Sequence, residues 1–167
     1  GNIGKEVIKR AQGFHMNILA VDLYPDHSFA KEIGFTYTSM ETLLKNADYI
    51  TIHTSLNDSS RALIGKKELT IMKNNAFLVN TARGGIVDET VLYEALSNHV
   101  IRGAALDVFE REPIGPSPLL TLPNFIATPH IAGYSYGALY ETGMMTARNI
   151  LNVLQGKPAE FEYQYDE

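Results

Sequence analysis

The sequence has 167 residues, of which 45% are hydrophobic and 20% are charged, and its formal net charge is −5. This composition is typical of a globular protein with a packed core, and the acidic balance argues against nucleic acid as a partner. The absence of cysteine excludes disulfides and zinc–thiolate sites and suits a reducing cytoplasm, while no apolar run approaches the roughly 20 residues that span a membrane.

The chain opens with a glycine motif formed by Gly1, Asn2, Ile3 and Gly4, followed by an amphipathic segment. The motif matches the last two glycines of G-x-G-x-x-G, where the backbone approaches a pyrophosphate at a helix N-terminus. Two glycines with this spacing also occur at ordinary helix starts. Because the full fingerprint needs an earlier glycine and a central strand, we expect the sequence to be a fragment whose first strand lies upstream of Gly1.

An apolar run at residues 16–23 predicts a buried strand that leads into a turn. Asp22 in this run lies 18 residues after Gly4, near the roughly 20-residue offset of the acid that binds ribose hydroxyls. Together with the glycine motif, it predicts a dinucleotide site. A carboxylate here would repel a 2′-phosphate, which favours NAD over NADP. The alternative is a solvated turn aspartate before Pro25.

Helices and strands alternate along the rest of the chain. Helices are predicted after Thr38, which has capping-box spacing to Glu41, after Asp88, and from Ser135 to Gln155. Apolar runs predict further strands at residues 47–54, 76–82, 101–109 and 124–130, and residues 57–75 read as loops and short helices. Since these strands are apolar on both faces, we expect an α/β fold with a doubly wound, parallel, Rossmann-like sheet.

Side chains capable of chemistry end or follow several of these runs: Asp22, His53, Arg83, Asp107 and His130. In a doubly wound fold, ligands bind at the carboxyl ends of the parallel strands. The pattern therefore predicts one ligand site at that edge of the sheet. No spacing of histidines and carboxylates indicates a metal site.

Three motifs occur in order: NTARGGIVDE at 80–89, GAALDVFEREP at 103–113 and TPHIAG at 128–133. With them, the sequence resembles the D-isomer-specific 2-hydroxyacid dehydrogenase family over nearly its whole length. The resemblance implies that residues 1–133 form an NAD-binding Rossmann domain truncated at its N-terminus. Residues 134–167 would form a C-terminal helix and tail returning towards an absent substrate domain. It also implies a homodimer.

The resemblance assigns catalysis to Arg83, Glu112 and His130, whose chemistry suits the reduction of a 2-keto acid. A guanidinium holds a carboxylate through two hydrogen bonds, and an imidazole exchanges protons near neutral pH. A carboxylate beside the imidazole favours its protonated form and fixes its orientation. The alternatives are a surface arginine, an exposed loop acid and a histidine that merely precedes a helix.

The same resemblance implies a set of cofactor contacts: Asp107 at the nicotinamide carboxamide, Thr81 and Ala82 beside the nicotinamide, His53 and Thr54 on the adenosine side, and Ala132 and Gly133. Thr54 and Ser55 depart from the family pattern, which more often has a small residue and proline here. This difference leaves the contacts of that wall open.

Two functions follow from these expectations. The first is an NAD-dependent oxidoreductase that transfers a hydride between nicotinamide and a 2-keto or D-2-hydroxy acid, a reaction that needs no metal. The second is an NAD(H)-sensing scaffold that binds proteins, similar to corepressors of this fold. The complete set of Arg83, Glu112 and His130 favours the enzyme. The isolated chain is expected to be inactive, because loss of a central strand exposes the backbone groups of its neighbours.

Overall fold

A computed structural model describes residues 1–161 of the chain. The chain divides into two compact units, Gly1–His130 and Ile131–Glu167. The second unit contains helix α6 (Tyr136–Leu154), which begins and ends as predicted. Ser135 caps it by accepting from the Ala138 N–H, and Gly156 follows it with a positive φ of 70°. No helix within residues 1–161 combines the length and apolar character needed to cross a membrane.

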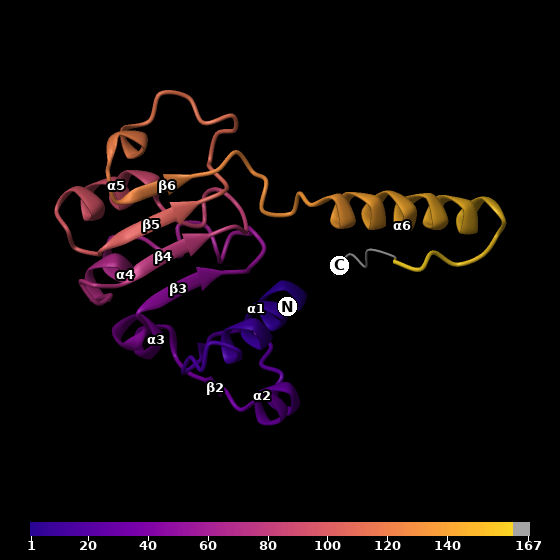
Figure 1. Ribbon diagram of the computed structural model, residues 1–167, viewed down its shortest axis with the longest axis horizontal. Coiled ribbons are helices and arrows are strands. Elements are labelled where there is room, and N and C mark those ends of the chain that lie inside the picture. The colour runs from indigo at the N-terminus through magenta and orange to yellow at the C-terminus, as the bar shows by residue number, and fades with distance from the viewer. Residues whose placement is uncertain (162–167) are drawn as a thin grey trace. The chain divides into compact units, whose positions relative to one another are not determined.

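The larger sheet of the first unit has four parallel strands that pair in chain order (Figure 1). They are β3 (Tyr49–Ile52), β4 (Phe77–Asn80), β5 (Gly103–Leu106) and β6 (Phe125–Ala127). Each lies inside a predicted apolar run but is shorter than it, because pairing with a neighbour rather than hydropathy sets the length of a strand. Parallel neighbours require crossover connections. These contain α4 (Lys66–Ile71), α5 (Glu89–Ser97) and the 3₁₀ helix η1 (Pro118–Thr121).

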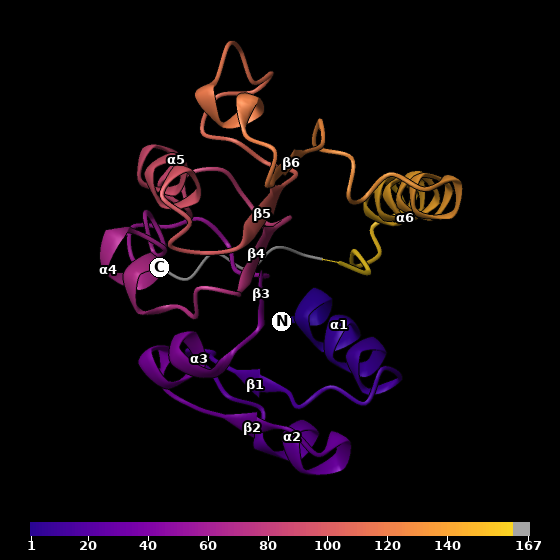
Figure 2. The same ribbon diagram turned by 60° about the vertical axis from the view of Figure 1, so that its left-hand side comes forward.

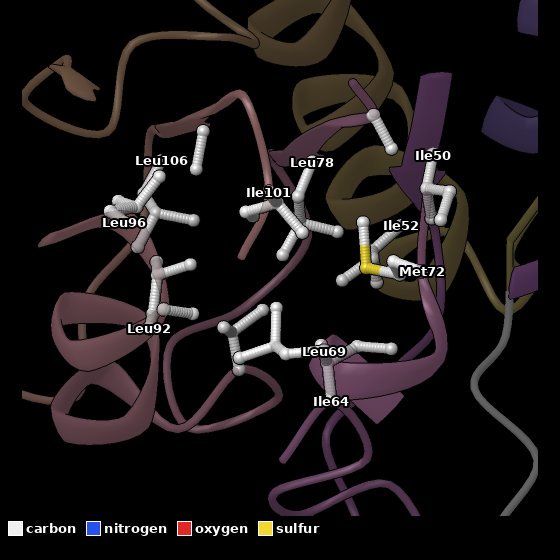
Figure 3. Packing of buried hydrophobic residues seen from close by; sticks show 14 of the residues in the cluster. Ile50, Ile52, Ile64, Leu69, Met72, Leu78, Leu92, Leu96, Ile101 and Leu106 are labelled. Carbon is white, nitrogen blue, oxygen red and sulfur yellow. The ribbon is translucent and has the colours of Figure 1, made fainter. Parts of the chain in front are cut away.

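The hydrophobic core lies between this sheet and the helices α3 (Met40–Asn46), α4 and α5, which cover one face of the sheet (Figure 2). Alternate residues of a strand point to opposite faces. Accordingly Ile50 and Leu78 are buried on the helix side, whereas Tyr49, on the opposite face, is 62% exposed. Figure 3 shows the strand side chains packed among Leu69 and Leu92 from the helices.

A smaller sheet of two parallel strands precedes the larger one. It is formed by β1 (Leu19–Ala20) and β2 (Thr36–Tyr37), with α1 (Asn2–Gln12) before it and α2 (His27–Ile33) between its strands. The sequence patterns did not predict α2 or β2. Helix α2 depends on local end signals rather than on an apolar period. Asp26 accepts from the Phe29 N–H at its start, and Gly34 ends it with a φ of 83°.

Of the two helix caps predicted in the first unit, one is confirmed and the other is wrong by one residue. Asp88 caps α5 as predicted, by accepting from the Val91 N–H at 3.0 Å. Helix α3, however, is capped by Ser39 and not by Thr38. The hydroxyl of Ser39 accepts from the Thr42 N–H, so the capping-box spacing from Thr38 to Glu41 was one residue out of register.

Candidate active site

The carboxyl ends of β3 to β6 share one edge of the larger sheet, because the four strands are parallel. Each strand is followed within three residues by a predicted site residue: His53, Arg83, Asp107 and His130 respectively. Asp22 occupies the corresponding position after β1 of the smaller sheet. The structure therefore places the predicted residues where ligands bind in folds of this class.

Glu112 and His130 form a hydrogen-bonded pair at this edge. Nδ1 of His130 lies 2.7 Å from Oε2 of Glu112, and the Phe109 N–H donates to Oε1 at 2.9 Å. Since an ionised carboxylate can only accept, the imidazole donates from Nδ1, which leaves Nε2 for a ligand. The bond from His130, followed by the bond from Phe109, lowers the pKa of Glu112. The carboxylate is therefore charged at neutral pH.

The backbone of His130 adopts a left-handed conformation with a φ of 54°, which is uncommon for a residue other than glycine. Two hydrogen bonds to the end of β5 hold this turn. The His130 N–H donates to the Asp107 carbonyl at 2.9 Å, and the Thr128 N–H donates to the Leu106 carbonyl at 3.0 Å. The side chain of His130 remains 49% exposed, so a ligand can reach it.

Arg83 lies on the loop after β4, and this loop is held by the buried side chain of Asn80. The amide of Asn80 donates to the Arg83 carbonyl at 2.9 Å and accepts from the Ala82 N–H at 2.9 Å. The guanidinium is exposed and donates to the Ala82 carbonyl at 2.6 Å. The loop is thus ordered from within, while the charged group stays at the surface.

Asp107 is only 3% exposed, and the hydroxyl of Thr128 donates to its Oδ1. This bond adds to the backbone link between the ends of β5 and β6. Thr81 and Ala82 are half-buried at the end of β4. The other two predicted cofactor residues, Ala132 and Gly133, are exposed and belong to the second unit.

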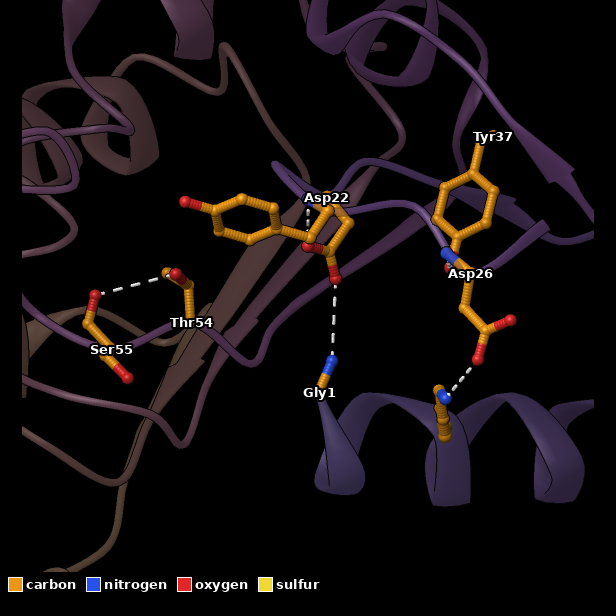
Figure 4. Close-up of polar contacts among 8 residues, drawn as sticks. Gly1, Asp22, Asp26, Tyr37, Thr54 and Ser55 are labelled. Carbon is orange, nitrogen blue, oxygen red and sulfur yellow. Dashed lines mark hydrogen bonds and ion pairs between the residues drawn. The ribbon is translucent and has the colours of Figure 1, made fainter. Parts of the chain in front are cut away.

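The start of α1 lies close to Asp22 and to the end of β3. The backbone nitrogen of Gly1 is 3.5 Å from Oδ2 of Asp22 (Figure 4), and a Cβ built on Gly4 would lie 3.7 Å from the Cβ of His53. Asp22 also accepts from the Tyr24 N–H at 2.9 Å, which orients its carboxylate. The predicted glycine motif, ribose acid and adenosine-side histidine therefore come together.

His53 is half-buried, and its Nε2 lies 2.9 Å from the hydroxyl of Thr51. Burial is the main cause that lowers the pKa of His53, so the imidazole is neutral at neutral pH. Thr54 and Ser55, which depart from the family pattern, are exposed beside it. The Thr54 hydroxyl makes one long bond of 3.5 Å to the Ser55 carbonyl (Figure 4), so both hydroxyls remain accessible to a ligand.

Several residues that shape the site were not singled out from the sequence. Asn80 and Thr128 organise the ends of β4 and β6, and Gly84 and Glu89 contact the loop that carries Glu112. A buried polar residue that ends an apolar run is a usable signal for Asn80. Within residues 1–161, no group of three or more histidine, aspartate or glutamate side chains could hold a metal ion.

Comparisons with known proteins agree with this geometry. The sequence profile described as "D-isomer specific 2-hydroxyacid dehydrogenase, NAD binding domain" matches residues 1–132. The chain is 45% identical over 161 residues to D-3-phosphoglycerate dehydrogenase of Methanocaldococcus jannaschii, covering 96% of this chain and 31% of that protein. It is 42% identical over 158 residues to glyoxylate reductase of Korarchaeum cryptofilum, covering 94% of this chain and 48% of that protein.

The fold also matches solved structures. The crystal structure of D-lactate dehydrogenase with NAD⁺ from Lactobacillus jensenii superposes with a TM-score of 0.91 at 31% identity, covering 99% of this chain and 53% of that chain. The D-lactate dehydrogenase TP0037 from Treponema pallidum gives a TM-score of 0.90 at 32% identity, covering 99% and 54%. The chain spans between about a third and a half of the curated relatives described above. The chain belongs to the D-isomer-specific 2-hydroxyacid dehydrogenase family, whose NAD-binding domain matches residues 1–132.

Proposed function

We propose that the protein containing this chain is an NAD-dependent oxidoreductase that interconverts a 2-keto acid and a D-2-hydroxy acid. The observation that carries the proposal is the Glu112–His130 pair, with its 2.7 Å contact and its exposed imidazole at the carboxyl edge of the sheet. Glu112 holds the proton on Nδ1, so His130 can use Nε2 to donate a proton to a carbonyl oxygen or to accept one from a hydroxyl.

The described residues fit a dinucleotide. Gly1 and Gly4 carry no side chain at the start of α1, which lets a phosphate approach the backbone there. Asp22 offers an exposed carboxylate for ribose hydroxyls. When bound, NAD supplies or accepts the hydride. Arg83 supplies the positive charge that would bind the substrate carboxylate and orient the keto group.

The relatives and solved structures described above are dehydrogenases and reductases, which supports the enzyme over the protein-binding scaffold. We further propose a homodimer and a cytoplasmic location, both by family analogy. Light scattering during gel filtration tests the first, and microscopy of a tagged protein in its native cell tests the second. A monomeric mass or a location outside the cytoplasm would count against these two parts alone.

The direct test is oxidation of NADH by the protein that contains this chain, measured against a panel of 2-keto acids. The site variants are His130→Asn and Arg83→Gln. His99→Asn is a matched control, since His99 is exposed and has the same left-handed backbone, with a φ of 52°, which asparagine tolerates. Arg102→Gln removes an exposed guanidinium beside Phe77, away from the site.

We expect turnover of one acid that is lost by a factor of about 100 or more in both site variants and retained in both controls. Full activity in His130→Asn would refute the assigned proton donor. NADH binding without reduction of any acid would overturn the oxidoreductase and leave the nucleotide-sensing scaffold as the better account.

A further inference from the structure

The loop that carries Glu112 approaches the loop that carries Arg83 most closely at Gly84 among the glycines. A Cβ built on Gly84 would lie 2.0 Å from the carbonyl oxygen of Phe109 and 2.6 Å from the nitrogen of Glu110. The φ of Gly84 lies outside the left-handed region, so its conformation does not require glycine. The position requires glycine because the peptide between Phe109 and Glu110 occupies the space of a side chain.

The same peptide is also held by Glu89, in the first turn of α5. The Glu110 N–H donates to Oε1 of Glu89 at 2.7 Å. Glu89 is half-buried, and burial raises the pKa of its carboxyl group, whereas the bond from Glu110 opposes that shift. Gly84 and Glu89 belong to one continuous segment, so both contacts join the loop of Glu112 to the segment that begins with Arg83.

These contacts extend to the catalytic carboxylate through one residue. The N–H of Phe109 donates to Oε1 of Glu112, and Oε2 of Glu112 bonds to His130. The carbonyl of Phe109 is the group that packs against Gly84. The positions of the carboxylate and of the imidazole are therefore set relative to the Arg83 loop.

We propose that Gly84 and Glu89 are positioning residues that fix the Glu112–His130 pair relative to Arg83. The inference rests on the proposed function, in which one substrate must reach both the guanidinium and the imidazole. A misplacement of about 1 Å between two such groups can reduce a rate by a factor of about 100. Neither residue touches the substrate in this account.

The test compares variants of Glu89 in the protein that contains this chain, with kcat, KM and NADH affinity measured for each. Glu89→Ala removes the acceptor of the Glu110 N–H. Glu89→Gln removes the charge and replaces one oxygen with an NH2 group, but keeps a carbonyl oxygen that can accept from the Glu110 N–H. Both remove the favourable negative charge at the start of α5 equally, so the comparison isolates the hydrogen bond. Glu94→Ala, at an exposed position of the same helix, is the matched control.

We expect Glu89→Ala to lower kcat by about tenfold, the factor that corresponds to the loss of one hydrogen bond, with KM and NADH affinity nearly unchanged. Glu89→Gln and Glu94→Ala should retain the kcat of the unmodified protein. Gly84→Ala provides a second perturbation of the same contact, and we expect it to lower kcat by about 100-fold.

The inference would be overturned if either Glu89→Ala or Gly84→Ala had the same kcat as the unmodified protein. So would an equal loss in Glu89→Ala and Glu89→Gln, since charge rather than position would then explain the effect. Failure of the unmodified protein to reduce any acid is a different result. It would refute the proposed function on which the inference rests.

Discussion

Asn80 offers a sharp test of how the Arg83 loop is held. The side chain is 1% exposed, and both ends of its amide are bonded to the loop, to the Arg83 carbonyl and to the Ala82 N–H. Asn80→Leu keeps a side chain of similar shape but removes both bonds. Each lost hydrogen bond costs about 1 kcal/mol, and the cost is somewhat larger when the backbone group that loses its partner is buried and cannot bond to water instead. We therefore expect the free energy of unfolding to fall by about 2–4 kcal/mol.

The same substitution should reduce activity by more than the stability change explains. With the loop released, Arg83 is no longer presented in one position, so kcat/KM for the keto acid should fall at least about tenfold. The matched control is Asn124→Leu. The amide of Asn124 likewise makes two bonds to the backbone. Both are donated, to the carbonyls of Leu96 at 3.2 Å and of Arg102 at 3.4 Å, and they lie near the starts of the strands. It should cost stability and leave kcat/KM unchanged.

Urea unfolding followed by circular dichroism measures the stability of both variants, and steady-state kinetics measures their activity under conditions in which each is folded. An Asn80→Leu protein with unchanged unfolding midpoint and unchanged kcat/KM would refute the reasoning. Equal losses of kcat/KM in the two variants would refute its second half, because the effect would then not be specific to the Arg83 loop.

The remaining predictions concern the core and the pH dependence of stability. Leu78→Ala, at a fully buried position of β4, should lower the free energy of unfolding by about 2–5 kcal/mol in urea titrations; a loss below about 1 kcal/mol would contradict the packing described. The pKa of Glu112 is lowered from 4.5 by its bond from His130, so the folded state binds fewer protons than the unfolded state near and below that pH. The stabilisation from this pair is therefore complete above pH 4.5 and is lost as the pH falls through the folded pKa. Glu112→Gln should flatten the acid side of a plot of unfolding midpoint against pH, and an unaltered plot would show that the pair does not contribute.

The larger sheet could be predicted from the sequence because its strands are short apolar runs, each followed by a polar side chain capable of chemistry. This pattern located β3 to β6 and the edge at which the site lies. Helix α2 was missed because its boundaries depend on Asp26 and Gly34, while its interior has no clear apolar period. The prediction of the smaller sheet was also incomplete. Each of its strands has only two residues, which is too short for a clear apolar run, and β2 was not predicted.

The residues of the candidate site also fall into those that could be predicted from the sequence and those that could not. Arg83, Glu112 and His130 lie in long motifs and could be selected from the sequence. Gly84 and Glu89 lie in the first of these motifs too, but no sequence signal singled them out, because the role proposed for them depends on contacts with residues 109 and 110, far along the chain. Glycine after arginine is ordinary in a loop, and glutamate is ordinary in the first turn of a helix. Only the folded chain shows that the two contacts converge on one peptide.

The left-handed turn at His130 has a consequence for how the site becomes ready to act. Such a backbone conformation costs of the order of 1–3 kcal/mol at a residue other than glycine, and here it is held by hydrogen bonds to the end of β5. That cost is met when the domain folds, so under the proposed function an arriving substrate would not have to reorganise this histidine. The imidazole is preorganised, and the binding energy of the proposed substrate would remain available for aligning the substrate itself.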